Sequence, residues 1–260
     1  GSGFIGNHLI NELSSAGHNI VALIRPNSKL NQKLKFKPKL ILKELNQLTV
    51  DDLYGIDVVV NLVCAGVSPK KATWEELENV NINFSMKLIK YAQLAKVKRF
   101  IATGSCLEYG TEANKWDFIH PRASLNPTTP YASSKAASFF LLNSFAEENS
   151  IEFFYGRIFY AFGSGQYRYN FFPSLKNAAL NGEDFKISDP DVVLDFIPVE
   201  DVANHLRIAV ERDDIISYKP FVVNIGTGKG VKLIDFAKSK WNEYMATGKL
   251  LTEENNNHGA

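Results

Sequence analysis

Cysteine is scarce in this 260-residue sequence, and neither sign of charge is in clear excess. There are 2 cysteines, and 29 lysines and arginines face 28 aspartates and glutamates, for a formal net charge of +1. Two cysteines make a poor disulfide framework, so we interpret Cys64 and Cys106, both in apolar strand-like context, as buried reduced thiols of a cytoplasmic protein. The balanced charge argues against a nucleic-acid partner, which a basic surface would attract.

Long apolar runs are also missing. No apolar stretch in the sequence approaches the roughly 20 residues that cross a bilayer, so we expect no membrane partner. We assign no metal site. The remaining composition, 45% hydrophobic and 22% charged, is that of a globular protein. The length fits one large domain, or one domain with a smaller lobe.

Strand-like and helix-like segments alternate along the first part of the chain. Apolar runs typical of buried strands are separated by amphipathic stretches of helical length. This alternation predicts an α/β fold with a doubly wound parallel sheet, in which ligands bind beyond the carboxyl ends of the strands. The expected strands are 19–24, 58–63, 99–103 and 153–159, and the expected helices are 7–16, 74–96 and 129–148.

A glycine turn opens the chain. Gly3-Phe4-Ile5-Gly6 leads directly into the first expected helix. Such glycines let the backbone approach a pyrophosphate, and the helix N-terminus supplies free N–H donors. A strand normally precedes this turn. We therefore interpret the chain as a fragment without its first strand, and we predict a gap between strands 20–24 and 58–62. A glycine-rich terminus without a ligand is the alternative interpretation.

Arg25 ends the strand that follows the glycine turn and its helix. In dinucleotide-binding sheets, a residue about 20 positions after the glycines meets the adenosine ribose. An acid there binds the 2′-hydroxyl of NAD, whereas an arginine accommodates the 2′-phosphate of NADP. Arg25 therefore favours NADP, although a solvated loop arginine would look the same.

Tyr131 and Lys135 are four residues apart in an expected helix, so they share one of its faces. A free tyrosine titrates near pH ~10, and a neighbouring cation favours its phenolate. The pair is therefore a candidate acid/base group, since such groups work best near the operating pH. An exposed tyrosine and lysine on a surface helix are the alternative.

After residues 163–165 the alternation gives way to short mixed elements. We predict a dinucleotide-binding domain over 1–165 and a smaller substrate-binding lobe over 166–260, which looks truncated. The segment 194–211 is expected to pack on the first domain. The strand 221–225 is assigned to the lobe.

Several motifs, in a consistent order, resemble the extended short-chain dehydrogenases/reductases, namely the nucleotide-sugar branch of the NAD-dependent epimerase/dehydratase family. That resemblance implies a Rossmann-type sheet whose first strand is missing here. The matching residues are 3–6, Asn81, 103–110, 130–135, 195–203 and 224–228.

The resemblance implies a role for each matched position. Tyr131 corresponds to the catalytic base/acid, and Lys135 to the lysine that holds the nicotinamide ribose and lowers the tyrosine pKa. Ser105 corresponds to the hydroxyl that hydrogen-bonds the reacting oxygen. For Leu62, Val63, Asn81 and Phe159, core or turn packing is the alternative. The cofactor-binding candidates, with Arg25 from its spacing, are Gly3, Phe4, Ile5, Gly6, Arg25, Glu44, Leu45, Leu62, Val63, Asn81, Tyr131, Lys135 and Phe159.

Three departures bear on the reaction. Leu107 stands where family dehydratases carry a glutamate, and the neighbouring Glu108 should point to the opposite face of a strand-like segment. We therefore predict no dehydratase activity. Leu194 replaces an arginine and Tyr160 replaces an asparagine of many family members, which leaves the nucleotide of the substrate open.

The resulting hypothesis is an NAD(P)-dependent nucleotide-sugar 4-epimerase or 4-keto reductase, with NADP slightly favoured over NAD. The alternative is a non-catalytic dinucleotide-binding or redox-sensing module. The family analogy also implies a homodimer through the helices 74–96 and 129–148.

Overall fold

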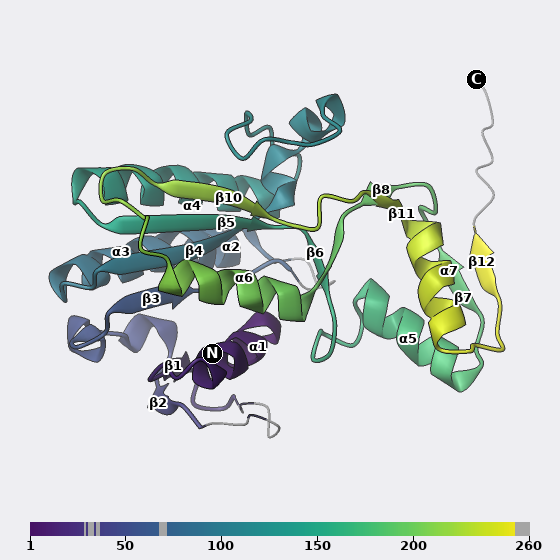
Figure 1. Ribbon diagram of the computed structural model, residues 1–260, viewed down its shortest axis with the longest axis horizontal. Coiled ribbons are helices and arrows are strands. Elements are labelled where there is room, and N and C mark those ends of the chain that lie inside the picture. Colours follow the sequence, from purple (N-terminus) through teal and green to yellow (C-terminus); the bar gives the residue numbers. More distant parts are fainter. Residues whose placement is uncertain (29, 31–33, 35–36, 68–71, 253–260) are drawn as a thin grey trace.

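A four-stranded parallel sheet forms the centre of the computed structural model, which describes residues 1–28, 30, 34, 37–67 and 72–252 (Figure 1). The strand order is β10-β5-β4-β3. This confirms the predicted parallel α/β fold. The strands are β3 (Val58–Asn61), β4 (Arg99–Ser105), β5 (Glu152–Ile158) and β10 (Phe221–Ile225).

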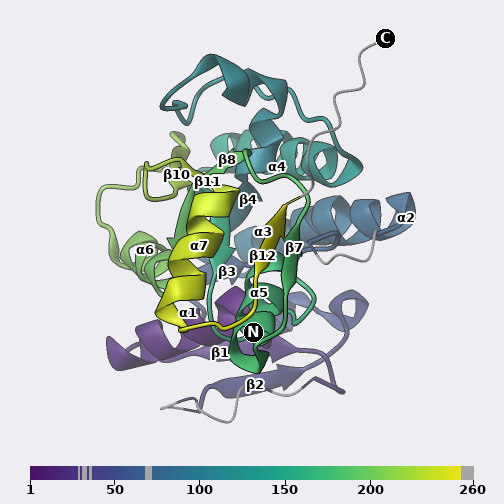
Figure 2. The ribbon, with the colours of Figure 1, turned by 90° about the vertical axis from the view of Figure 1, so that its right-hand side faces the viewer.

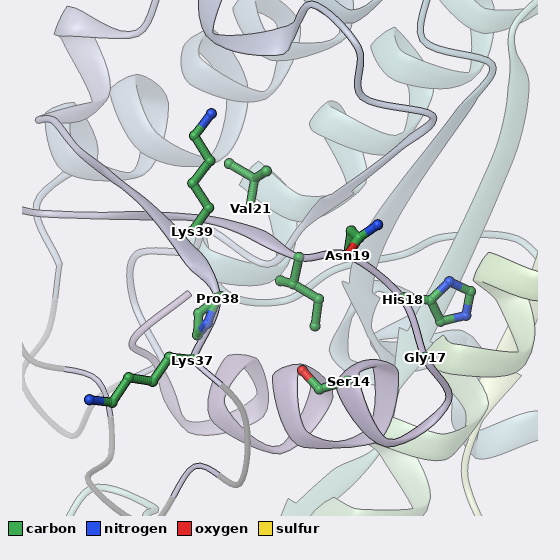
Figure 3. Close-up of a pocket in the computed structure, with 9 residues that line it drawn as sticks. Ser14, Gly17, His18, Asn19, Val21, Lys37, Pro38 and Lys39 are labelled. Carbon is green, nitrogen blue, oxygen red and sulfur yellow. The ribbon is translucent and has the colours of Figure 1, made fainter.

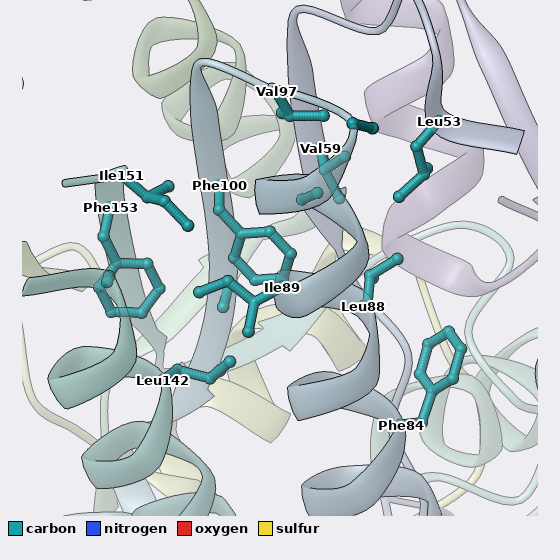
Figure 4. Packing of buried hydrophobic residues seen from close by; sticks show 14 of the residues in the cluster. Leu53, Val59, Phe84, Leu88, Ile89, Val97, Phe100, Leu142, Ile151 and Phe153 are labelled. Carbon is teal, nitrogen blue, oxygen red and sulfur yellow. The ribbon is translucent and has the colours of Figure 1, made fainter. Parts of the chain in front are cut away.

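Helices cover both faces of this sheet because its strands are apolar on both sides. On one face Phe100 and Phe153 pack against Ile89 and Leu142, as Figure 4 shows. On the other face Ile101 and Phe154 join a second cluster, built from the remaining two helices. The first face carries α3 (Ser85–Leu94) and α4 (Pro130–Glu148), and the second carries α1 (Phe4–Ser15) and α6 (Val199–Glu211).

A separate two-stranded parallel sheet contains β1 (Val21–Ile24) and β2 (Lys39–Leu42). β1 and β3 lie in different sheets, and none of the described strands pairs with both of them. The predicted gap between these two strands is therefore confirmed. The backbone nitrogen of Gly1 donates a hydrogen bond to the Leu23 carbonyl at 2.7 Å, which places the glycine turn beside β1. The 3-10 turns η1 (Leu45–Gln47) and η2 (Val50–Leu53) follow β2.

The helix expected over 74–96 is interrupted. It begins as α2 (Trp74–Leu77), becomes the π-helical segment η3 (Glu78–Phe84), and continues as α3. Thr73 caps its start by accepting a hydrogen bond from the Glu76 backbone nitrogen at 3.1 Å. Single π-helical turns occur mostly at functional sites, and this one holds the buried Asn81.

The C-terminal part forms a small lobe beyond the carboxyl end of β5 (Figure 1), which is seen from its outer side in Figure 2. The hydrophobic core of this lobe includes Leu175, Ile187 and Trp241. One assignment was wrong: β10 belongs to the main sheet, where Phe221 pairs with Phe154. The lobe contains α5 (Phe171–Asn181), α7 (Leu233–Glu243), the parallel pair β7 (Phe185–Ile187) and β12 (Leu250–Thr252), and the antiparallel pair β8 (Val193–Leu194) and β11 (Val231–Lys232).

Two short strands connect the sheet to the lobe: β6 (Tyr160–Phe162) pairs with β9 (Phe196–Pro198). Beyond β9, the residues Val202 and Leu206 of α6 pack on the main sheet, in agreement with the expectation for 194–211. The boundary at 165 and the homodimer stay predictions. Within the described ranges, no helix combines the length and apolar character that a membrane crossing requires.

Candidate active site

The candidate catalytic side chains lie where the strands of the main sheet end. Ser105 is the last residue of β4, while Tyr131 and Lys135 occupy the first two turns of α4. Thr129 caps α4 by accepting a hydrogen bond from the Ala132 backbone nitrogen at 3.2 Å. This cap fixes the helix start. The i,i+4 spacing then places the phenol and the amine on one face, with Lys135 only 6% exposed.

The phenol oxygen of Tyr131 has neighbours from two other elements. The Ser105 hydroxyl lies near enough to affect its pKa, and the Cys64 thiol, on the loop after β3, donates to it at 3.8 Å. Burial raises the pKa of Tyr131 well above its usual value, the Cys64 thiol raises it further, and Ser105 lowers it. Burial and Cys64 outweigh Ser105, and the expected lowering of this pKa by Lys135 is not seen.

Gly66 brings the loop after β3 against Tyr131. Its φ is +89°, a conformation that side-chain-bearing residues rarely adopt. A Cβ at this position would lie 2.9 Å from Leu77 Cδ2 and 3.1 Å from Tyr131 Cδ2. Only glycine lets the backbone pass this close to the tyrosine ring.

Asn81 ties the same loop to α4. Its side chain is inaccessible to solvent, and its Oδ1 accepts from the Ala65 backbone nitrogen at 2.8 Å. Its Nδ2 donates to Ser134 Oγ at 2.8 Å, and Ser134 donates to the Tyr131 carbonyl at 2.8 Å. The cofactor contact expected for Asn81 stays a prediction. Its hydrogen bonds connect the loop after β3 to α4.

Glu108 differs from the sequence expectation. It lies in the 3-10 turn η4 (Cys106–Tyr109), not on an extended segment, and it is fully buried. Its carboxylate accepts from the Ser105 backbone nitrogen, the Tyr155 hydroxyl and Arg157 Nε, at 2.8, 2.8 and 2.7 Å. Leu107 is 39% exposed. Sequence reasoning missed Arg157, Tyr155 and the nearness of Cys64 to Tyr131, since no local pattern marks them.

The start of α1 fits a pyrophosphate. Gly3 is its N-cap and provides no capping side chain, and the space around Gly3 is open, with no atom within 4 Å of a Cβ placed there. The first-turn N–H groups are therefore available to an anion. Of the other candidates, Arg25 and Glu44 are exposed, whereas Phe4, Ile5, Leu45, Leu62, Val63 and Phe159 are half-buried and Gly6 is buried.

One cavity lies elsewhere in the fold. It has a volume of about 460 Å³ and is lined by residues around the amino ends of β1 and β2, among them His18, Val21 and Lys39 (Figure 3). The candidate catalytic residues gather at the opposite, carboxyl, ends of the strands. This cavity is therefore not the candidate active site.

The parallel sheet and the groups at its carboxyl edge define a Rossmann-type dinucleotide-binding protein. The sequence model of the NAD dependent epimerase/dehydratase family matches residues 1–226, so the chain belongs to that family.

Among curated relatives, CDP-abequose synthase of Salmonella typhimurium is 25% identical over 256 residues, which is 97% of this chain and 81% of the relative. UDP-glucose 4-epimerase of Erwinia amylovora is 25% identical over 273 residues, covering 92% of this chain and 80% of the relative. The solved structure of MoeE5 in complex with UDP-glucuronic acid and NAD has a TM-score of 0.81 and 29% identity. It matches over 96% of this chain and 83% of the other.

Proposed function

We propose that this protein is an NAD(P)-dependent oxidoreductase or isomerase that acts on a nucleotide-activated sugar, as a 4-epimerase or a 4-keto reductase. The observation that carries the proposal is the convergence of Ser105 on the Tyr131 phenol, with Lys135 buried one turn along. The names of the two curated relatives support a nucleotide-sugar substrate. The MoeE5 complex supports a nicotinamide dinucleotide.

Tyr131 is the acid/base of the proposed reaction. Its oxygen takes the proton of a sugar hydroxyl when that carbon is oxidised, and it returns the proton when a ketone is reduced. Ser105 donates a hydrogen bond to the same sugar oxygen. Burial keeps Tyr131 protonated at neutral pH, the form that protonates a ketone. Taking a proton requires the phenolate, which the positive charge of an oxidised nicotinamide ring would favour. A bound nicotinamide dinucleotide would supply the hydride chemistry.

The dinucleotide would lie from the start of α1 to the Tyr131–Lys135 face. Gly3 to Gly6 would hold the pyrophosphate, Glu44 and Leu45 the adenine, and Lys135 the nicotinamide ribose. Arg25 is exposed immediately after β1, which favours a 2′-phosphate and hence NADP. Fluorescence titrations with NADPH and NADH test this preference.

Dehydration needs an additional acid/base near the sugar, and this chain offers none at position 107. Leu107 has no ionisable proton, and both carboxylate oxygens of Glu108 are occupied by buried donors. We therefore propose that the protein is not a dehydratase. A product lighter by one water, detected by mass spectrometry from a UDP- or CDP-linked sugar, would contradict this.

Replacing the phenol tests the whole proposal. We expect Tyr131→Phe to lower turnover of UDP- and CDP-linked sugars at least 10²-fold, since general acid–base catalysis contributes about 10²–10⁴-fold, while dinucleotide binding is kept. Tyr54→Phe is the control, because Tyr54 is 63% exposed and precedes β3 at its amino end. Loss of reduced-nicotinamide absorbance with 4-keto sugars indicates a reductase; redox-neutral interconversion of sugars indicates an epimerase. Unchanged turnover in Tyr131→Phe would leave a non-catalytic binding module.

A further inference from the structure

A fully buried carboxylate lies directly behind the candidate catalytic serine. Glu108 Oε1 accepts the Ser105 backbone N–H at 2.8 Å, and Oε2 accepts Arg157 Nε at 2.7 Å. Neither Glu108 nor Arg157 is more than 1% exposed. Ser105 is thus held through its backbone by a charged group that cannot relax into water.

The same carboxylate reaches α4 through Tyr155 on β5. The Tyr155 hydroxyl donates to Glu108 Oε1 at 2.8 Å and also lies 3.4 Å from the Lys135 carbonyl oxygen. The Tyr155 ring packs against Phe139 of α4, with the centroids 4.7 Å apart. Glu108 therefore connects the end of β4, which carries Ser105, to the helix that carries the other two candidate catalytic residues.

The surrounding residues are shaped to hold this carboxylate. A Cβ on Gly104 would lie 2.3 Å from Glu108 Oε1 and 2.6 Å from the Tyr155 hydroxyl, so residue 104 needs to be glycine. The guanidinium of Arg157 lies 4.5 Å from the centroid of the Phe139 ring and donates to the Pro121 carbonyl at 2.9 Å. Breaking such a buried pair is costly, because it leaves an uncompensated charge in a dry environment.

We propose that Glu108, fixed by Arg157, is a positioning residue: it sets the Ser105 hydroxyl relative to the Tyr131 oxygen without touching the substrate. This inference rests on the proposed function and adds to it the groups that align the acid/base centre. A displacement of about 1 Å can cost on the order of 10²-fold in rate, so a small shift of Ser105 is enough to be measured.

Glu108→Gln tests the proposal, because an amide cannot accept hydrogen bonds on both sides. In one orientation the NH₂ group would face the Arg157 Nε–H donor. In the other it would face the Ser105 and Tyr155 donors, so that one set of hydrogen bonds is lost either way. Glu112→Gln is the matched control. Glu112 is also buried and accepts from Lys115 Nζ at 2.7 Å and Trp116 Nε1 at 3.1 Å, away from the Ser105–Tyr131 contact. With UDP- and CDP-linked sugars, we expect Glu108→Gln to lower kcat about 10–100-fold with KM within about threefold, and Glu112→Gln to change neither.

A second readout does not depend on turnover. The pKa of Tyr131 is measured in cofactor-free protein from the ultraviolet absorbance change that Tyr131→Phe removes. Ser105→Ala should raise this pKa in the wild-type and Glu112→Gln backgrounds, because the Ser105 hydroxyl lowers it. In the Glu108→Gln background, Ser105→Ala should leave it unchanged. Each background is compared with the same background carrying Ser105→Ala. The charge of Glu108 therefore cancels, and so do the contributions of the other groups near the phenol, Cys64, Lys135 and Tyr155.

The outcomes separate this inference from the proposed function. If the wild-type protein turns over no nucleotide sugar, the proposed function fails and the titration cycle still decides the positioning role. An equal effect of Ser105→Ala in all three backgrounds would overturn the inference. If Glu108→Gln does not fold, Arg157→Lys replaces it in the cycle, since it keeps a cation and removes the Nε–H bond that fixes Glu108. A full Ser105 effect in Arg157→Lys would then overturn it.

Discussion

An arginine–glutamate pair lies at each end of strands β4 and β5, part-buried at the amino end and fully buried at the carboxyl end. At the amino end Arg99 of β4 pairs with Glu152 of β5 at 2.6 Å. At the carboxyl end the order is reversed, and Arg157 of β5 pairs with Glu108 just after β4 at 2.7 Å. Both ends pair a guanidinium with a carboxylate, but the two pairs differ in burial and in what they contact.

The amino-end pair belongs to the scaffold. Arg99 Nη1 donates to the Ala209 and Val210 carbonyls in the last turn of α6, at 3.0 and 2.7 Å. A cation at a helix C-terminus is favourable and satisfies carbonyls that lack an intrahelical partner. The carboxyl-end pair instead contacts Ser105 and, through Tyr155, α4. One pair anchors a helix to the sheet, whereas the other aligns the candidate active site.

Arg157→Met and Arg99→Met should separate these two roles, with the largest expected effects. Arg157→Met leaves Glu108 buried and unpaired, which we expect to cost about 3–5 kcal/mol in the free energy of unfolding. Arg99→Met should cost less, about 1–3 kcal/mol for the orphaned carbonyls, because Glu152 keeps Lys98 at 3.4 Å. Urea unfolding at fixed pH measures both costs.

Turnover should differ more sharply than stability. Measured well below both unfolding midpoints, Arg157→Met should lower turnover at least tenfold through Ser105, while Arg99→Met stays within about twofold of the wild type. Equal losses of turnover in the two variants would show that the carboxyl-end pair is only another scaffold contact.

Two glycines on either side of β3 extend the comparison. Gly55 precedes the strand with φ +76°, and Gly66 follows it with φ +89°. Alanine at either position should cost on the order of 1–3 kcal/mol, because the left-handed conformation strains any side-chain-bearing residue. The measurement is again urea unfolding.

Their surroundings predict different effects on activity. A Cβ at position 55 meets no atom within 4 Å, whereas one at position 66 lies 3.1 Å from the Tyr131 ring. Gly66→Ala should therefore lower turnover about tenfold or more by displacing the phenol, and Gly55→Ala should leave it unchanged. A Gly66→Ala variant with full turnover would show that the ring tolerates displacement.

The amino and carboxyl ends of the strands also differ in how far the sequence predicts their structure. The alternation of apolar runs and helices predicts the parallel sheet, and local motifs predict Ser105, Tyr131 and Lys135, because each depends on neighbours in sequence. Glu108 and Arg157, in contrast, are 49 positions apart, and Cys64 and Tyr131 are 67 apart. No spacing rule brings such residues together.

The misplaced strand has a similar reason. Phe221–Ile225 was assigned to the lobe because it follows lobe segments in the chain, yet it pairs with β5 across a long connection. Parallel strands need a crossover of a dozen or more residues, but the crossover does not say which strand the next one pairs with. The π-helical turn around Asn81 was missed as well, since residues 78–84 contain no glycine or proline that would mark it.

The smallest expected effect on the free energy of unfolding comes from modifying the two thiols. Both lie beyond the carboxyl ends of strands of the main sheet. Cys64 is exposed, so its predicted burial was wrong, while Cys106 is part-buried and burial raises its pKa to about 12. A thiol with a raised pKa stays protonated and unreactive near neutrality, and it gains reactivity only as the pH rises towards that value. At pH 8, iodoacetamide should therefore modify one thiol per chain rapidly, and the fast phase should vanish in Cys64→Ser but persist in Cys106→Ser.

Alkylation of Cys64 should also abolish turnover, because its Sγ lies 3.8 Å from the Tyr131 oxygen and the adduct would occupy the space that the sugar needs. The free energy of unfolding should barely change, since Cys64 is exposed. Added NADPH or NADH should slow the fast phase by covering the thiol. Rapid labelling of both cysteines, or full turnover after Cys64 is alkylated, would show that this end of the sheet is more open than the contacts around Tyr131 indicate.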